Sequence, residues 1–123
     1  MSKILVIEDD KFLREMITRK LDKEGYDVDQ AVDGEEGLEK IREGRPDIIL
    51  LDLIMPGVGG FEVLEEVQDD PEVNDIPIVI LSNLGQKSEV ERGLNLGAED
   101  FMIKAHFTPK EIIEKIKEIL GRD

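Results

Sequence analysis

The stretch that decides the fold is ILVIEDD, residues 4–10, in which four apolar residues are followed by three acids. Continuous apolar runs of this length predict strands that are buried on both faces, as in parallel sheets. Further runs occupy residues 48–51, 76–81 and 101–103, and residues 26–32 alternate as a strand at the edge of a sheet would. The sequence therefore predicts five strands.

Amphipathic stretches lie between these runs, with apolar residues at the spacing of a helix face. The five faces are Phe12, Leu13, Met16, Ile17 and Leu21; Leu38 and Ile41; Phe61, Val63, Leu64 and Val67; Val90, Leu94 and Leu96; and Ile112, Ile113, Ile116, Ile119 and Leu120. The predicted helix ends are the N-caps Asp10, Asp33 and Thr108 (with Pro109 after it) and the stops Gly25 and Gly44. Gly93 weakens the fourth stretch. Strand and helix alternate five times, which predicts an α/β fold, a single doubly wound parallel sheet with helices on both faces.

The composition limits the function classes that remain. The 123 residues, 40% of them apolar, suffice for one domain over residues 1–123, and no output domain is expected. A net charge of −14 argues against direct binding of nucleic acid or of an anionic membrane. The absence of cysteine and the single histidine exclude disulfides, thiol catalysis and most histidine-based sites. With no signal peptide and no apolar run of about 20 residues, a cytoplasmic location is expected.

Polar side chains follow four of the predicted strands: Glu8 and Asp9, Asp52, Ser82, and Lys104. Ligands of open α/β sheets bind beyond the carboxyl ends of the strands, so these side chains are expected to converge. The three carboxylates are hard oxygen ligands of the kind that Mg²⁺ prefers. A carboxylate beside Mg²⁺ can attack a phosphoryl donor and form an aspartyl phosphate, while a lysine neutralises the transferring group.

Four motifs occur in order at the predicted strand ends: EDD at residues 8–10, DLIMPG at residues 52–57, Ser82, and GAEDFMIK at residues 97–104. Each motif is weak alone, but together they are specific. In these motifs the chain resembles the receiver domain of bacterial two-component response regulators, over residues 3–120. The resemblance implies a flavodoxin-like (βα)5 fold with the sheet order 2-1-3-4-5.

The resemblance also implies the roles of the site residues. Asp52 would be the phosphoacceptor, and Lys104 would contact the phosphoryl group. Glu8, Asp9 and Asp52 would hold Mg²⁺ together with the backbone carbonyl of Ile54. The expected function is a phosphorylation-activated signalling switch rather than an enzyme on external substrates, because the protein would catalyse only its own phosphorylation and dephosphorylation.

Ser82 and Phe101 match the switch positions of the resembled family. A sensor histidine kinase would donate the phosphoryl group, and a downstream effector protein would read the result. The surface that reports the change would consist of the fourth helix, the strand at residues 101–103 and the helix from Pro109. Homodimerisation through the same surface is an alternative that the residues leave open.

Several residues depart from the family pattern, and two others bear on the rate at which the phosphoryl group is lost. Ala105 stands where a proline with a cis bond is usual, and a trans bond is expected here because a cis non-proline bond costs ~3–4 kcal/mol. Asn83 stands where a smaller residue is usual, and Phe101 lacks the hydroxyl of the commoner tyrosine. Ile54 and Leu84 match two positions that, in the resembled family, tune loss of the phosphoryl group. Because both are apolar, they predict slow self-dephosphorylation.

Each of these residues also has a plainer interpretation. Asp9 and Asp10 can cap a helix, and Asp52 can be a turn residue. Lys104 can be a solvated lysine at a strand end. Phe101 is explained equally well as a core or half-buried aromatic residue.

Two rival functions remain. A flavodoxin-like protein that binds a flavin or nucleotide predicts a phosphate loop rich in Gly, Ser and Thr after the first strand, where this chain has acids. A non-phosphorylated pseudo-receiver acting as a protein-docking module predicts a missing acceptor, metal acid or lysine, and only Ala105 favours it. His106 is predicted to be a loop residue rather than a phosphorelay histidine.

Overall fold

A computed structural model describes residues 2–121, in which strands and helices alternate as the sequence predicts. The strands are β1 (Lys3–Ile7), β2 (Asp27–Ala31), β3 (Ile48–Leu51), β4 (Ile78–Ser82) and β5 (Asp100–Ile103). The helices are α1 (Lys11–Lys23), α2 (Gly34–Gly44), α3 (Gly60–Gln68), α4 (Lys87–Asn95), the short 3-10 helix η1 (Lys104–His106) and α5 (Pro109–Leu120). None of the helices within residues 2–121 is long and apolar enough to cross a membrane.

The five strands form one parallel sheet in the order β2-β1-β3-β4-β5. The α/β fold class and the strand order implied by the resemblance are therefore confirmed. The alternating strand, β2, lies at the edge of the sheet as predicted. The continuous apolar runs β1, β3 and β4 lie inside the sheet, where both of their faces are covered.

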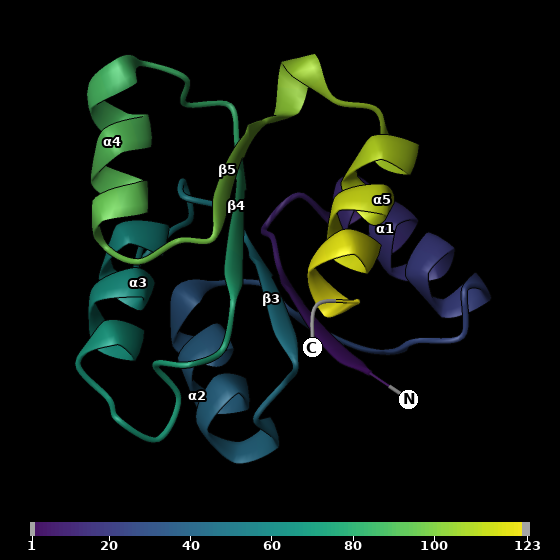
Figure 1. Cartoon of the computed structure of the whole chain (residues 1–123), viewed down its shortest axis with the longest axis horizontal. Helices are drawn as coiled ribbons and strands as arrows, with labels where there is room; N and C mark the ends of the chain where they lie inside the picture. Colours follow the sequence, from purple (N-terminus) through teal and green to yellow (C-terminus); the bar gives the residue numbers. More distant parts are fainter. Residues whose placement is uncertain (1, 122–123) are drawn as a thin grey trace.

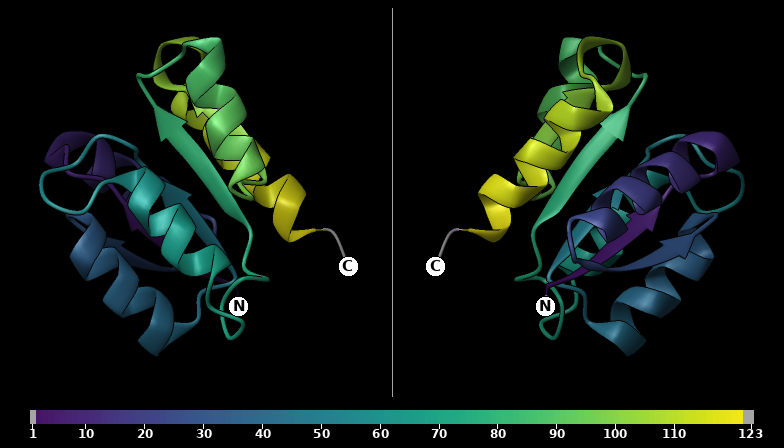
Figure 2. Two further views of the ribbon diagram at one scale, coloured as in Figure 1. Left: turned by 90° about the vertical axis from the view of Figure 1, so that its left-hand side faces the viewer. Right: turned by 90° about the vertical axis from the view of Figure 1, so that its right-hand side faces the viewer.

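Helices cover the two faces of the sheet in two layers (Figures 1 and 2). Alternate strand residues divide between two hydrophobic cores, because successive side chains of a strand point to opposite faces. Leu5 and Ile7 pack in the core that includes α2 and α3. Ile4 and Val6 pack in the core that includes α1 and α5.

The predicted helix caps are present. Asp10, Asp33 and Thr108 each accept a hydrogen bond from the backbone N–H of the third residue after them, at 3.1, 2.8 and 3.2 Å. Gly25 follows the C-cap of α1 with a φ of 93°, and α2 ends at Gly44. Local sequence therefore marks where α1, α2 and α5 begin and where α1 and α2 end, and α1 begins directly after the acids of residues 8–10.

Two residues predicted on buried helix faces are exposed instead. The exposed fraction of Phe12 is 77%, and that of Leu94 is 44%. The buried side of α1 follows Ile17 and Leu21, and Phe12 precedes Leu13 by one residue, which places it about 100° away around the helix. On α4, only Gly93 is buried.

Gly93 lets α4 approach the sheet closely. A Cβ atom at Gly93 would lie 2.7 Å from Cδ1 of Ile80 and 3.1 Å from Cδ2 of Phe101. The glycine that weakens the helix prediction is therefore the residue that allows the helix to pack closely against the sheet. A second glycine, Gly57, has a φ of 73°, which fits the third position of a type II turn with Pro56 at the second.

Candidate functional site

The carboxyl ends of four strands meet at one edge of the sheet. Glu8 follows β1, Asp52 follows β3, Ser82 ends β4 and Lys104 follows β5. A cavity of about 290 Å³ opens at this edge, lined by Glu8, Asp9, Asp10, Asp52, Ile54, Asn83 and Lys104. The structure thus brings together the sequence-predicted acids and the lysine, whereas Ser82 is fully buried and does not line this cavity.

Three carboxylates gather in the cavity. Glu8, Asp9 and Asp52 each offer one oxygen atom, and these oxygen atoms all lie within 4.8 Å of one another. Glu8 and Asp52 are buried, with exposed fractions of 2% and 5%, while Asp9 is exposed. Like charges this close, two of them removed from water, destabilise the ionised form of one another.

Lys104 partly offsets this repulsion. Its Nζ atom lies 2.8 Å from Oε1 of Glu8 and 3.5 Å from Oδ2 of Asp52, and only 17% of its side chain is exposed. The ammonium group therefore pairs more closely with Glu8 than with Asp52. Lys104 is the one basic residue among the lining residues, against the four acids Glu8, Asp9, Asp10 and Asp52, so the lining is predominantly acidic.

The pKa values of these groups reflect burial and mutual charge. Burial, with a contribution from the charge of Asp52, raises the pKa of Glu8 from 4.5 to about 7. Burial also raises the pKa of Asp52, against the opposing charge of Lys104. Burial alone would lower the pKa of Lys104, but the hydrogen bond to Glu8 and the charges of both carboxylates raise it above its usual value. Burial therefore disfavours the ionised forms of Glu8 and Asp52, and Lys104 offsets only part of this cost.

Backbone amides fix two of the carboxylates and the hydroxyl. The N–H of Asp10 donates to Oε2 of Glu8 at 3.2 Å, and the N–H of Ile54 donates to Oδ1 of Asp52 at 3.4 Å. The N–H of Leu84 donates to Oγ of Ser82 at 3.3 Å. These bonds come from the loops that follow the strands, so the fold itself holds the polar groups in place.

Comparison with known proteins identifies the family. The family model described as "Response regulator receiver domain" matches residues 4–117. The chain belongs to this receiver domain family. It is thus a receiver domain of a two-component response regulator, as the four sequence motifs implied.

Relatives and solved structures agree with this membership. The phosphate regulon transcriptional regulatory protein PhoB of Rhizobium meliloti is 37% identical over 120 residues, which are 98% of this chain and 52% of PhoB. The regulator RpaA of Synechocystis is 37% identical over 122 residues, which are 99% of this chain and 50% of RpaA. The receiver domain of the Francisella response regulator 1452 superposes with a TM-score of 0.91 at 31% identity, covering 99% of this chain and 98% of that one. This receiver domain spans about half the length of the curated relatives that it matches.

Phe101, the candidate switch residue of the receiver domain, is half-buried. Its ring packs against the core that includes α2 and α3, and it lies close to Gly93 of α4. The plainer interpretation of Phe101 as a half-buried aromatic residue therefore describes this conformation. Because the ring lies close to Gly93, a rotation of the ring would change its contact with α4.

The loop after Lys104 takes its own form in this receiver domain. The Lys104–Ala105 peptide bond is trans, as expected for a residue other than proline. Residues 104–106 form η1, and His106 is exposed on it, outside the residues that line the acidic cavity. His106 is therefore a surface residue, as predicted, but it lies at the end of a short 3-10 helix rather than in a loop.

The donor set of the receiver domain fits a small hard divalent cation. Glu8, Asp9 and Asp52 supply carboxylate oxygens, and three such ligands suit Mg²⁺, which keeps several of its waters. The pKa values of Glu8 and Asp52 are raised chiefly by burial, which the ammonium group of Lys104 does not fully offset. A divalent cation would stabilise the ionised carboxylates further.

Arg14 belongs to the site but was missed in the sequence. It lies in the first turn and a half of α1, and its guanidinium donates hydrogen bonds to the backbone carbonyls of Glu8 and Asp9 at 2.8 and 3.5 Å. An arginine on an amphipathic helix is normally solvated, so the pattern carries no signal for this contact. Asn83, which the sequence singled out as a departure, does line the cavity.

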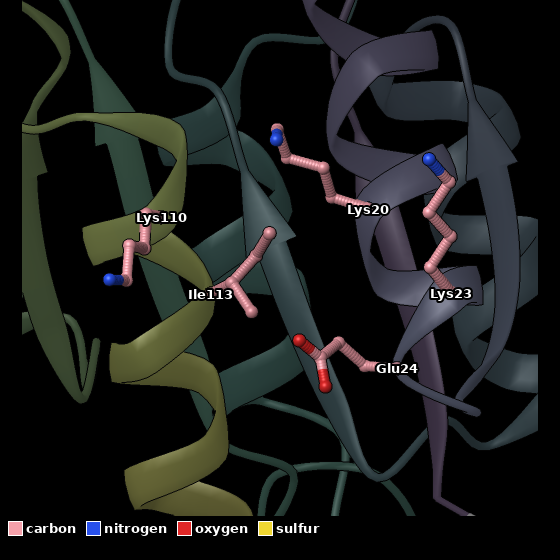
Figure 3. Close-up of a pocket in the computed structure, with 5 residues that line it drawn as sticks. All are labelled: Lys20, Lys23, Glu24, Lys110 and Ile113. Carbon is pink, nitrogen blue, oxygen red and sulfur yellow. The ribbon is translucent and has the colours of Figure 1, made fainter.

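A second cavity, of about 270 Å³, lies between α1 and α5 and has a different character (Figure 3). Its lining residues are Lys20, Lys23, Glu24, Lys110 and Ile113. Glu24 is paired with Lys117 at 2.8 Å. Because this lining is mostly cationic, it does not offer the oxygen ligands of the acidic cavity.

Proposed function

We propose that this receiver domain is a phosphorylation-activated switch. Asp52 accepts a phosphoryl group from a sensor histidine kinase in the presence of Mg²⁺, and the domain then changes conformation to control a downstream effector protein. The observation that carries the proposal is the cluster of three carboxylate oxygens within 4.8 Å of one another, with Lys104 against two of them. The domain acts on no external substrate and catalyses only its own phosphorylation and dephosphorylation.

Glu8, Asp9 and Asp52 would hold the cation, with the backbone carbonyl of Ile54 as the further ligand that the family resemblance implies. When bound, Mg²⁺ supplies positive charge that neutralises the carboxylates and the phosphoryl oxygens. That charge would favour the ionised forms of Glu8 and Asp52, because an opposite charge nearby stabilises them. The ionised carboxylate of Asp52 is the form that attacks phosphorus.

In the transfer, a carboxylate oxygen of Asp52 forms a bond to phosphorus while the phosphorus–nitrogen bond of the donor phosphohistidine breaks. The donor imidazole takes up a proton, and an acyl phosphate remains on Asp52. Lys104, whose Nζ lies 3.5 Å from Oδ2 of Asp52, donates to a phosphoryl oxygen as negative charge develops there.

The conformational change begins at Ser82. Its hydroxyl now accepts a hydrogen bond from the N–H of Leu84, and a phosphoryl group on Asp52 offers that hydroxyl an acceptor within the site. Movement of this loop alters the space beside Phe101, which packs beneath α4 at Gly93. The face formed by α4, β5 and α5 thus reports the change, to an effector or to a second copy of the chain.

The switch is tested by recording amide NMR spectra before and after addition of acetyl phosphate with Mg²⁺. We expect shifts around Asp52 and also across α4, β5 and α5, and we expect neither when Mg²⁺ is omitted. Spectra that stay unchanged, or that change only in the cavity lining, would favour the protein-docking module that Ala105 suggests.

Loss of the phosphoryl group is expected to be slow, with a half-life of minutes or longer after acetyl phosphate is removed. The structure places Ile54 on the cavity lining with an exposed fraction of 56%, so its apolar side chain can limit the approach of water. Leu84 packs instead against the core, so the prediction rests on Ile54. Intact-mass spectra at successive times measure the decay, and Ile54→Asn should shorten it. A half-life of seconds in the unmodified protein would contradict the prediction.

A further inference from the structure

Arg14 makes hydrogen bonds to the loop that carries two of the three acids, Glu8 and Asp9. Its Nη1 atom donates to the carbonyl oxygen of Glu8 at 2.8 Å and to that of Asp9 at 3.5 Å. Its Nε atom donates to Oε1 of Gln30 at 3.2 Å. Gln30 belongs to β2, so one guanidinium group joins α1, the loop after β1 and the edge strand.

The loop after β1 leaves the sheet at Glu8. The N–H of Glu8 still donates to the carbonyl of Ala31 on β2 at 3.0 Å, which completes the strand pairing. The carbonyl of Glu8 has Arg14 as its donor. Arg14 thus orients the peptide groups from which the side chains of Glu8 and Asp9 extend.

Arg14 orients these peptide groups without binding a carboxylate oxygen. Its three hydrogen bonds go to two backbone carbonyls and to an amide oxygen, and no ion pair within residues 2–121 joins it to an acid. Lys104, in contrast, lies 2.8 Å from a carboxylate oxygen of Glu8 and competes with any cation there. The carboxylate oxygens therefore stay available to a metal ion while Arg14 holds their backbone.

We propose that Arg14 is a positioning residue for the divalent-cation site, an inference that rests on the proposed function. Partners that orient metal ligands typically change metal affinity by about 10–100-fold when they are removed. Arg14→Met, which keeps an apolar stem and removes every donor, should weaken Mg²⁺ binding by about tenfold or more.

The sign of the effect separates positioning from simple charge. Removal of a positive charge near a cation site should strengthen Mg²⁺ binding if Arg14 acted only through its charge. Positioning predicts weaker binding instead. Arg14→Lys keeps the charge but cannot make the same set of bonds from a planar fork, so it should also weaken Mg²⁺ binding, by less than Arg14→Met.

The test is calorimetric titration of the full chain with Mg²⁺, alongside urea unfolding in EDTA. Arg19→Met is the matched control, because Arg19 is an exposed arginine of the same helix. We expect a raised dissociation constant for Arg14→Met and Arg14→Lys, and an unchanged one for Arg19→Met. Gln30→Ala, which removes one of the three bonds, should give a smaller increase.

The outcomes separate this inference from the proposed function. If the unmodified protein binds Mg²⁺ and both Arg14 variants bind it equally well or more tightly, the positioning role is overturned and the switch stands. If Arg14→Met lowers only the urea midpoint and leaves the dissociation constant unchanged, Arg14 is merely structural and the inference also fails. If the unmodified protein binds no Mg²⁺, both proposals fall. Should Arg14→Met not fold, Arg14→Lys and Gln30→Ala carry the same comparison.

Discussion

Replacement of Lys104 by methionine is expected to slow phosphorylation of Asp52 by roughly a hundredfold or more, the usual effect of removing one donor that stabilises charge in the transition state. The Nζ atom of Lys104 is 3.5 Å from Oδ2 of Asp52, and its side chain is largely enclosed. A methionine fills similar space but offers no charge to the phosphoryl oxygens. The rate is measured as the gain of phosphorylated mass with acetyl phosphate and Mg²⁺.

The same substitution should strengthen Mg²⁺ binding. The ammonium group of Lys104 lies 2.8 Å from Oε1 of Glu8, so its removal frees a ligand and removes a competing positive charge. Lys110→Met is the control, because Lys110 is an exposed residue of α5 that lines the separate cavity of Figure 3, and its replacement should change neither quantity. A Lys104→Met protein that is phosphorylated at the normal rate would contradict the role assigned to this residue.

The second large effect concerns stability without metal. The pKa of Glu8 is about 7 in the folded protein, against an ordinary value of 4.5 that applies to the unfolded chain. Between these two pH values the folded protein therefore binds more protons than the unfolded chain. The free energy of unfolding should therefore fall as the pH rises through this range, by on the order of 3 kcal/mol from Glu8. Above pH 7 the contribution of Glu8 should level off.

Urea unfolding in EDTA at several pH values between 4.5 and 8 measures this slope. For Glu8→Gln, the free energy of unfolding should depend less on pH than in the unmodified protein, and it should be higher at pH 8. Glu39 is an exposed glutamate of α2, and Glu39→Gln should leave the pH dependence unchanged. Saturating Mg²⁺ should stabilise the unmodified protein most at high pH, because the metal binds the ionised carboxylates. Equal slopes for Glu8→Gln and the unmodified protein would show that Glu8 does not carry the buried charge.

The sequence predicts much of this fold because each local signal agrees with the others. The run at residues 48–51 is apolar without alternation, which is the pattern of a strand covered on both faces. Asp10 and Thr108 cap helices at the expected places. The order of strands came from the resemblance, since periodicity alone does not say which strands are neighbours.

The sequence does not predict which atoms pair. Strand ends at one edge imply that Glu8, Asp52 and Lys104 converge, but not that Lys104 lies nearer to Glu8 than to Asp52. The exposure of Phe12 was missed because helical spacing near a helix end leaves one-residue ambiguity in the buried face. Arg14 was missed because two of its three hydrogen-bond partners are backbone carbonyls, which every sequence possesses.

The identity of the acceptor tests the account most directly. The unmodified protein, Asp52→Asn and the control Asp75→Asn, an exposed aspartate of the loop before β4, are incubated with acetyl phosphate and Mg²⁺ and their intact masses are compared. We predict a gain of one phosphoryl group in the unmodified protein and in Asp75→Asn, and no gain in Asp52→Asn. No gain in the unmodified protein, or an equal gain in all three, would contradict the assignment of Asp52 as the phosphoacceptor.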